Sequence, residues 1–250
     1  MGHSEKESAL FARTALLLGP QAMEKLSSAR VIVFGIGGVG SWCVESLLRS
    51  GIKHITLVDA DDISLSNVNR QLMATARNIG QVKVDVMRKR LLEIDPDAEI
   101  IARNEVYTAE SAKDFDLDSY DYVLDCIDSL KDKISLIINA TASSATFFSS
   151  LGSALKIDPC KIKVAEFWKV RGCPLGSMLR KRIRQSGILP SKDFLCVYDE
   201  EVLPNKGQAP SPDEDPGLFK KAQVNGTLSH ITGIFGLTLA GLVIKDITER

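Results

Sequence analysis

One stretch of the sequence, residues 30–59 (RVIVFGIGGVGSWCVESLLRSGIKHITLVD), limits most strongly what this chain can fold into. It begins with a short apolar run, residues 31–34, which is bounded by glycine and is typical of a buried parallel strand. Residues 41–50 have apolar side chains at helical spacing, and residues 54–58 form a second apolar run that ends at Asp59. The order strand, helix, strand predicts an α/β fold with a parallel sheet.

The turn between the first strand and the helix is rich in glycine. Gly35, Gly37 and Gly40 have G-x-G-x-x-G spacing, which lets the backbone approach a phosphate closely while the helix start points N–H groups at the anion. Asp59 follows the second strand, where an acid can accept hydrogen bonds from ribose hydroxyls. In this context the glycine motif predicts a nucleotide site, but it does not say which nucleotide.

Composition narrows the class of protein. The 250 residues can bury a core as one large domain or two small ones, and a net charge of −1 gives no global signal for nucleic acid. The five cysteines include no C-x-x-C pair, which argues against a zinc knuckle or a secreted disulfide scaffold, so we expect a cytoplasmic protein. The longest apolar run, residues 231–244, is shorter than the roughly 20 residues of a membrane span and predicts a buried helix.

A polar segment follows Asp59 directly. If Ser66 caps a short helix, then Asn67, Arg70 and Gln71 lie on one face, at i, i+3 and i+4. Asn67 can donate to a ribose or a base, and Arg70 can bind phosphate oxygens with its forked guanidinium. A solvated helix face is the alternative. We favour a role in the nucleotide site, because open α/β sheets bind ligands where their strands end.

Two charged residues stand at the ends of predicted elements. Lys83 lies in the first turn of a helix predicted over residues 81–94, where a cation opposes the helix dipole. This placement suggests contact with a phosphate, and a plain surface lysine is the alternative. Asp128 follows a strand that ends near Asp125, and it would repel a phosphate unless a cation lay between, which implies Mg²⁺. Asp128 could also cap the helix expected over residues 130–141.

The second half of the chain has a different charge pattern. Residues 156–184 hold nine basic and two acidic residues, with Trp168 among them. Such a local excess is typical of a surface that binds a polyanion. The candidates for polyanion contacts are Lys169, Arg171, Arg180, Lys181 and Arg184. The alternatives are a solvated helix near residues 175–186 or contact with the acidic loop, residues 199–215.

Two further residues allow two interpretations each. Arg13 lies in an amphipathic helix expected over residues 9–26, with a break near Gly19, and by itself is best interpreted as a surface arginine. Cys173 precedes a predicted helix and follows Arg171, so its pKa could be lowered and its thiol nucleophilic. A buried, inert thiol is the more frequent case.

The motifs together resemble a known family. GIGGVGSW, LVDAD, LSNVNRQ, IGQVKV and DCIDS, in this order and spacing, are similar to the ThiF/MoeB/HesA family of ubiquitin-activating-like adenylating enzymes. The segments FARTALLLG, KIDP and CPLGSMLRKR and the glycine-rich last helix resemble the tRNA threonylcarbamoyladenosine dehydratase branch of that family. The resemblance covers nearly the whole chain.

The resemblance implies a fold and a reaction. The fold would be a Rossmann-like, doubly wound, mostly parallel sheet with a C-terminal antiparallel extension and a closing helix. Residues 1–150 would form the ATP-binding domain, and residues 151–250 a substrate-binding and dimerisation portion on the same sheet. The reaction would be ATP-dependent adenylation of a carboxylate. In the branch this carboxylate belongs to threonylcarbamoyladenosine in tRNA, which then closes to a ring with loss of water and release of AMP.

The resemblance also implies site residues by matching position. Arg13 would reach the phosphates from the other subunit of a homodimer, Asp128 would hold Mg²⁺, and Arg70 and Lys83 would neutralise phosphate charge. The residues expected to bind the nucleotide are Gly35, Gly37, Gly38, Asp59, Asn67, Arg70, Gln71 and Lys83. Ring closure needs no enzyme nucleophile, so Cys173 need not act. Transfer RNA would be the partner, and a sulfur-transfer protein is a further candidate.

Three other functions stay open at this point. Adenylation of the C-terminal Gly-Gly of a sulfur-carrier protein is one, although enzymes of that kind usually have paired C-x-x-C motifs. An NAD-dependent oxidoreductase would use the glycine turn and Asp59 equally well, but it gives no role to Arg70, Lys83 and Asp128. A non-catalytic tRNA-binding or scaffold protein would not need a complete ATP site.

Overall fold

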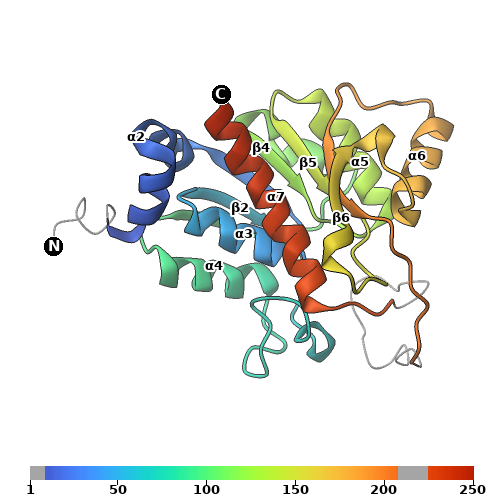
Figure 1. Cartoon of the computed structure of the whole chain (residues 1–250), viewed down its shortest axis with the longest axis horizontal. Helices are drawn as coiled ribbons and strands as arrows, with labels where there is room; N and C mark the ends of the chain where they lie inside the picture. The colour runs from blue at the N-terminus through green and yellow to red at the C-terminus, as the bar shows by residue number, and fades with distance from the viewer. Residues whose placement is uncertain (1–8, 208–224) are drawn as a thin grey trace.

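The structure is a computed structural model that describes residues 9–207 and 225–250. Within these residues seven strands form one sheet. The strands are β1 (Arg30–Phe34), β2 (His54–Val58), β3 (Glu99–Arg103), β4 (Tyr122–Asp125), β5 (Thr146–Ser150), β6 (Ile162–Glu166) and β7 (Leu195–Asp199). Their order is β3-β2-β1-β4-β5-β7-β6, and each neighbouring pair is parallel except β6 and β7 (Figure 1). The expected doubly wound, mostly parallel sheet with an antiparallel extension is confirmed.

Helices cover both faces of the sheet. The helices are α2 (Ala12–Ser28), α3 (Gly40–Arg49), α4 (Lys83–Ile94), α5 (Leu130–Ala142), α6 (Pro174–Ser186) and α7 (Ser229–Glu249). Short 3₁₀ helices are η1 (Leu65–Asn67), η2 (Ala112–Phe115), η3 (Leu117–Ser119), η4 (Pro159–Lys161) and η5 (Phe167–Lys169). Helices α2, α3, α4 and α7 share one apolar core on one face, and α5 and α6 share a second core on the other.

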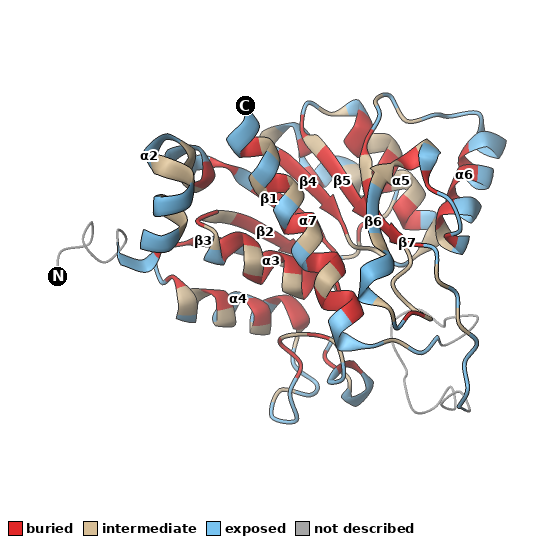
Figure 2. Ribbon diagram, in the orientation of Figure 1, coloured by how far each residue is buried: buried red, intermediate tan, exposed pale blue. Residues whose placement is uncertain are grey.

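Strand β1 shows why the first apolar run has no polar residue. Val31 and Val33 belong to the core under α3 and α7, whereas Ile32 and Phe34 belong to the core under α5. Successive side chains of a strand point to opposite faces, so a central strand with both faces covered must be apolar throughout. Figure 2 shows this buried centre between the two helix layers.

Helix α7 joins the second half of the chain to the first. It returns across the sheet and packs on α3 (Figure 1). The contact needs small residues, since a Cβ atom on Gly236 would lie 2.3 Å from the carbonyl oxygen of Val39 and Gly233 faces the Trp42 ring. By length and composition α7 could cross a membrane, but half of its most apolar window is buried inside the protein, which favours the expected core helix. The division of the chain at residue 150 stays a prediction.

Both predicted helix caps are wrong by one or two positions. Helix η1 starts after Ser64, not Ser66, and the Ser64 N–H donates to Asn67 Oδ1 (3.2 Å). Helix α5 starts after Ser129, not Asp128, and the Ser129 hydroxyl donates to Asp132 (2.6 Å). The position of a helix cap depends on where the chain leaves the preceding strand. Local sequence predicts that position only to within a residue or two.

Two helices differ in detail from their sequence patterns. Helix α2 has its break where expected, because Gly19 adopts a positive φ of 78°. Helix α4 starts at Lys83, and its buried apolar side chains are Val84, Met87 and Leu91. The sequence pattern predicts Val82, Val86, Leu91 and Ile94 as the inward face, but of these only Leu91 is fully buried.

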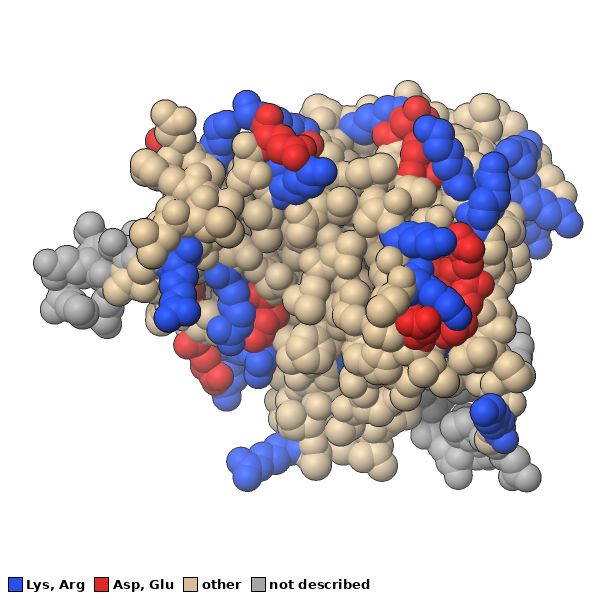
Figure 3. Space-filling model, in the orientation of Figure 1, with Lys and Arg blue, Asp and Glu red and all other residues tan. Residues whose placement is uncertain are grey.

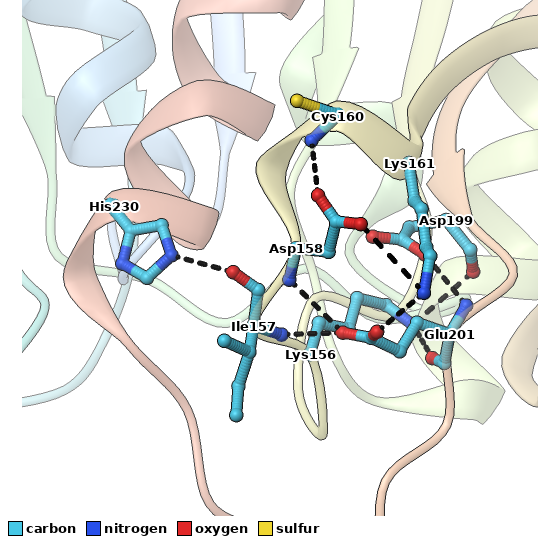
Figure 4. A network of polar contacts seen from close by, with 8 residues as sticks. All are labelled: Lys156, Ile157, Asp158, Cys160, Lys161, Asp199, Glu201 and His230. Carbon is cyan, nitrogen blue, oxygen red and sulfur yellow. Dashed lines mark hydrogen bonds and ion pairs between the residues drawn. The ribbon is translucent and has the colours of Figure 1, made fainter.

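A polar network ties the loop after β5 to the end of β7 (Figure 4). The buried Lys156 ammonium donates to the carbonyl oxygens of Asp199 (3.2 Å) and Glu201. The Glu201 carboxylate accepts from the N–H of Ile157 (2.6 Å) and pairs with Lys161 (2.8 Å). The hydrogen bond from Lys161, together with those from the backbone, lowers the pKa of Glu201 to about 2.

This pKa predicts an acid-sensitive contact. The pKa of Glu201 is depressed from an ordinary value of 4.5 to about 2, so its ionised form stabilises the fold above about pH 4.5 and that contribution is lost as the pH falls toward 2. We expect urea unfolding to show a smaller loss of stability between pH 6 and pH 3 for Glu201→Gln than for the wild type. Glu200→Gln, which removes a more exposed ion pair with Lys163, is the control. Parallel pH curves for Glu201→Gln and wild type would contradict this prediction.

Candidate functional site

The glycine turn lies at the carboxyl end of β1, where two of its glycines are required by sterics. A Cβ atom on Gly40 would lie 1.9 Å from the carbonyl oxygen of Gly35. Gly35 itself has a φ of 88°, and a Cβ atom there would lie 2.8 Å from the carbonyl oxygen of Cys126. The turn is therefore packed directly against the loop that follows β4. This close backbone packing leaves N–H groups at the start of α3 available to an anion.

Asp59 holds this turn in place. One carboxylate oxygen accepts from the N–H of Ile36 (2.7 Å), and the other accepts from the N–H of Asp61 (3.0 Å). Burial raises the pKa of Asp59, and the ammonium of Lys83, 3.8 Å away, opposes the shift. Asp59 thus links the carboxyl end of β2 to the turn after β1. Its binding to a ribose stays a prediction.

Lys83 is not a surface lysine. Its side chain is only 5% exposed, and its ammonium lies 2.7 Å from Asp61 Oδ2 and 3.8 Å from Asp59 Oδ1. The two carboxylates offset the unfavourable position of a cation at the start of α4. Sequence reasoning missed Asp61, although the repeated acid in the motif LVDAD was the available signal.

Helix η1 and the segment after it contain three of the predicted residues, Asn67, Arg70 and Gln71. Asn67 is buried, and its side-chain oxygen is used by the Ser64 N–H. Gln71 is also buried, and its Oε1 has no hydrogen-bond partner among the described residues. Its Nε2 lies 3.8 Å from the place of a Cβ atom on Gly37. A buried unpaired amide oxygen beside the turn fits a ligand that donates to it.

Arg70 is held from three sides. Its guanidinium donates to the Ser66 carbonyl oxygen (2.8 Å) and to Asn69 Oδ1 (2.9 Å). Its own carbonyl oxygen accepts from Trp42 Nε1 (3.1 Å), and its Cγ lies 3.3 Å from the place of a Cβ atom on Gly38. Arg70 therefore lies against the glycine turn. This position suits a group that binds a phosphate placed on that turn.

Asn69, which sequence reasoning did not single out, connects this segment to the far end of the chain. Its Nδ2 donates to the Thr227 carbonyl oxygen (3.1 Å), just before α7. Thr232, in the first turn of α7, has a methyl carbon 3.2 Å from the place of a Cβ atom on Gly38. The start of α7 is thus part of the wall around the site.

Asp128 is exposed just beyond β4. The preceding residue, Ile127, has its backbone nitrogen 3.2 Å from the place of a Cβ atom on Gly35, so Asp128 stands beside the glycine turn. The described residues contain no cluster of three or more His, Cys, Asp or Glu that could hold a metal alone. One carboxylate fits Mg²⁺ that takes its other ligands from phosphates and water.

Asp125, at the end of the strand before Asp128, forms an ion pair that sequence reasoning missed. Lys133 Nζ is 2.8 Å from Asp125 Oδ2, and both side chains are 0% exposed. Asp125 was correctly assigned to the end of the strand. No local signal identified Lys133 as its partner, because α5 brings the lysine back over the strand end only in the folded chain.

The structure does not bring Arg13 into the site of its own subunit. Arg13 is exposed near the start of α2. Helix α2 ends just before the amino end of β1, whereas the glycine turn follows the carboxyl end of that strand. Leu16 and Leu17 on the same helix are 88% and 83% exposed. The proposed action of Arg13 on a partner's phosphates is untested.

The basic stretch of residues 156–184 does not form one positive surface. Lys156 is buried, and Lys161 and Lys163 pair with Glu201 and Glu200. Figure 3 shows acidic side chains among lysines in this part of the surface. Acidic residues after β7 thus pair with lysines of η4 and β6, whereas the alternative from the sequence concerned the basic helix near residues 175–186. The rest of that loop, residues 208–215, lies outside the described residues.

Arg180 was wrongly predicted to face a polyanion. It is 9% exposed, and its guanidinium donates to the Phe167 carbonyl oxygen (3.1 Å). Lys169 is exposed but pairs with Glu166 (3.2 Å). The sequence pattern placed Arg180 on the exposed face of an amphipathic helix. In the structure this side chain lies on the buried face, against η5. Besides Lys169, the basic side chains that are exposed on and just before α6 are Arg171, Lys181, Arg182 and Arg184.

Cys173 fits the inert alternative. It is 1% exposed in the core under α6, and its sulfur accepts from the N–H of Gly176 (3.5 Å). A thiol in this position caps the helix and is closed to a substrate.

Comparison with known proteins agrees with this geometry. The tRNA threonylcarbamoyladenosine dehydratase of Bacillus subtilis is 33% identical over 240 residues, covering 96% of this chain and 94% of that protein. The Escherichia coli protein of that name is 36% identical over 255 residues, with the same shares covered. A crystal structure of the E. coli enzyme, TcdA, in complex with ATP is similar with a TM-score of 0.86 and 30% identity, covering 100% of this chain and 98% of that one.

The similarity extends over both cores of the sheet and over every residue placed around the glycine turn. The sequence matches the ThiF family over residues 11–250, which leaves only the N-terminal residues unmatched. The motifs, the strand order and the full-length relatives all agree. This chain therefore belongs to the ThiF family.

Proposed function

We propose that this chain is an ATP-dependent tRNA threonylcarbamoyladenosine dehydratase. The observation that carries the proposal is its full-length similarity to the E. coli enzyme solved with ATP. The charges around the glycine turn support it. Arg70 and Lys83 lie there with Asp59 and Asp128, an arrangement that suits a triphosphate better than a hydride carrier. Neither the paired C-x-x-C motifs of sulfur-carrier activation nor a second nucleotide motif is present in the sequence.

The proposed reaction has two steps. A carboxylate oxygen of the threonylcarbamoyl group attacks the α-phosphorus of ATP, the bond to the β-phosphate oxygen breaks, and pyrophosphate leaves. An oxygen or nitrogen atom of the same modification then attacks the activated acyl carbon and a proton is released, while AMP leaves with the former carboxylate oxygen, so the substrate has lost one water. Ring closure is intramolecular, which explains how a site with a buried Cys173 can act without an enzyme nucleophile.

The protein's part is to position two anions and offset their repulsion. Glycine-turn N–H groups face the phosphates, and Arg70 lies against the turn to bind them. Lys83 brings a buried positive charge that Asp61 and Asp59 hold in place. Asp128 would hold Mg²⁺, which would neutralise phosphate charge when bound. Asp59 and Gln71 are the proposed acceptors for the sugar or the base.

The decisive experiment is a nucleoside analysis. Incubation with ATP, Mg²⁺ and tRNA is expected to convert threonylcarbamoyladenosine into a product lighter by one water, detected by mass spectrometry. Arg70→Ala is expected to lower the rate by about 10²- to 10³-fold, the typical loss of one donor that stabilises developing charge. Arg49→Ala, an exposed arginine paired with Glu45 on α3, is the matched control and should keep normal turnover.

Two results would contradict the proposal. The first is adenylation of a sulfur carrier's Gly-Gly end with no change in tRNA. The second is calorimetric binding of NAD but not of ATP. Normal tRNA conversion by Arg70→Ala would refute the role of Arg70 and leave the reaction itself supported.

The tRNA surface that we propose is centred on α6 and is smaller than the sequence suggested. Its exposed charges are Arg171, Lys181, Arg182 and Arg184, and the Arg184 guanidinium lies 5.0 Å from the centre of the half-buried Trp168 ring. Within residues 9–207 and 225–250, acidic side chains pair with the lysines of η4, β6 and η5 but with none of these four. An unneutralised patch beside an aromatic ring is typical of RNA contacts.

Charge reversal tests this surface. The triple variant Lys181→Glu/Arg182→Glu/Arg184→Glu is expected to raise the tRNA Kd strongly and to flatten its salt dependence by about 0.9 in slope per lost phosphate contact. ATP affinity should not change. Reversal of three exposed lysines elsewhere, Lys89, Lys113 and Lys245, changes the net charge equally and is the matched control. Equal tRNA affinity in the two triple variants would refute the surface.

We propose a homodimer in which α2 meets the partner. Leu16 and Leu17 on α2, and Leu10 just before it, are 88%, 83% and 46% exposed, and exposed leucines grouped in this way are typical of a surface that another protein covers. Arg13 lies on the same helix and would act in the partner's site. A cytoplasmic location and a sulfur-transfer partner stay predictions.

Subunit mixing tests the role of Arg13. Arg13→Ala and Arg70→Ala are each expected to lose most of the activity alone. If Arg13 acts across the dimer, a mixed dimer contains one site with both arginines, so mixing should restore up to about half of the activity per mixed dimer. Action within one subunit would leave both sites defective, and no recovery would be seen. A monomeric mass in light scattering with full activity would also overturn the proposal.

A further inference from the structure

The ion pair between Asp125 and Lys133 is unusual in having no solvent exposure. The two charged atoms are 2.8 Å apart, and the Ser149 hydroxyl adds a hydrogen bond of 2.7 Å to the same carboxylate oxygen. Burying two charges removes their hydration, and this cost offsets most of their attraction, so apolar residues of similar volume are often equally stable. Stability alone therefore does not account for the pair.

The two charges hold one residue between them. Asp125 Oδ1 accepts from the N–H of Ile127 (3.1 Å), and Lys133 Nζ donates to the Ile127 carbonyl oxygen (2.9 Å). Both polar backbone groups of Ile127 are thus fixed by buried charges. Because α5 supplies Lys133 and β5 supplies Ser149, two elements besides β4 set the position of this residue.

Ile127 connects two parts of the nucleotide site. On one side is the peptide of Cys126, whose carbonyl oxygen would be 2.8 Å from a Cβ atom on Gly35. On the other side is Asp128. A displacement of Ile127 would move the carboxylate of Asp128 relative to the glycine turn, and a residue that would hold a metal ion needs a fixed position.

We propose that the Asp125–Lys133 ion pair positions Asp128 for metal-dependent nucleotide binding. The proposal rests on the function proposed above, in which Asp128 holds Mg²⁺. Asp125 and Lys133 are positioning residues, since Ile127 lies between them and the ligand. Their effect is expected in the Mg²⁺ dependence of ATP binding more than in the stability of the fold.

The test is a variant that removes both charges together. Asp125→Asn/Lys133→Met leaves no buried charge unpaired, and the new asparagine can still accept from Ile127 and bond to Ser149. We expect a thermal midpoint within a few degrees of the wild type. ATP affinity measured by calorimetry without Mg²⁺ should stay within about twofold. The gain in affinity that Mg²⁺ produces should fall by about 10- to 100-fold, the usual range for groups that orient a metal ligand.

Controls separate this inference from a general loss of structure. Glu45→Gln/Arg90→Met removes another ion pair between helices, 2.7 Å long, and should leave the Mg²⁺ dependence unchanged. If the main double variant does not fold, Ser149→Ala decides, because it removes only one hydrogen bond to Asp125 and should weaken the Mg²⁺ dependence severalfold. A wild-type Mg²⁺ dependence in whichever of the two variants folds would overturn the inference.

The result for Asp128→Asn shows which proposal has failed. If Asp128→Asn keeps the full Mg²⁺ dependence, the proposed metal role of Asp128 is wrong. If it loses the dependence and the double variant keeps it, Asp128 binds the metal without help from the ion pair.

Discussion

The close approach of the glycine turn to the loop after β4 is the constraint on which the site depends. A side chain at Gly35 would push the turn away from the carbonyl of Cys126 after β4, and a side chain at Gly40 would push the start of α3 away from the carbonyl of Gly35. The same contact brings the groups after β2 and β4 to a common edge. Asp59 reinforces it by accepting from the turn at Ile36. A site for an anion is thus built mainly from backbone, and side chains then adjust its charge.

Buried charges around this edge are organised in pairs. Lys83 lies between Asp59 and Asp61, and Lys133 lies on Asp125. Each pair links the end of a strand to a helix that begins beside it, so each contributes to geometry as well as charge. Arg70 lies beside the glycine turn, and its guanidinium donates to the Ser66 carbonyl oxygen and to the Asn69 side-chain amide.

The second half of the chain forms one wall of the site. Helix α7 packs so tightly on α3 that Gly236 touches the backbone at Val39, and its first turn reaches Gly38 through Thr232. The network around Lys156 holds the chain near the start of the same helix, where His230 also contacts Ile157 (3.0 Å). The apolar closing helix is consequently a structural part of the nucleotide site.

The sequence by itself determined the sheet, the glycine turn and the approximate edge where ligands bind, because these follow from local periodicity and from spacing within 30 or so residues. It also determined the family, through motifs such as LSNVNRQ and DCIDS. Only the tertiary structure decided the partners of charged side chains, since these come from distant segments. Lys133 meets Asp125, Lys161 meets Glu201, and Arg180 turns inward to Phe167. A count of charges along the chain cannot distinguish a buried or paired cation from an exposed one, and the predicted basic surface was too large for that reason.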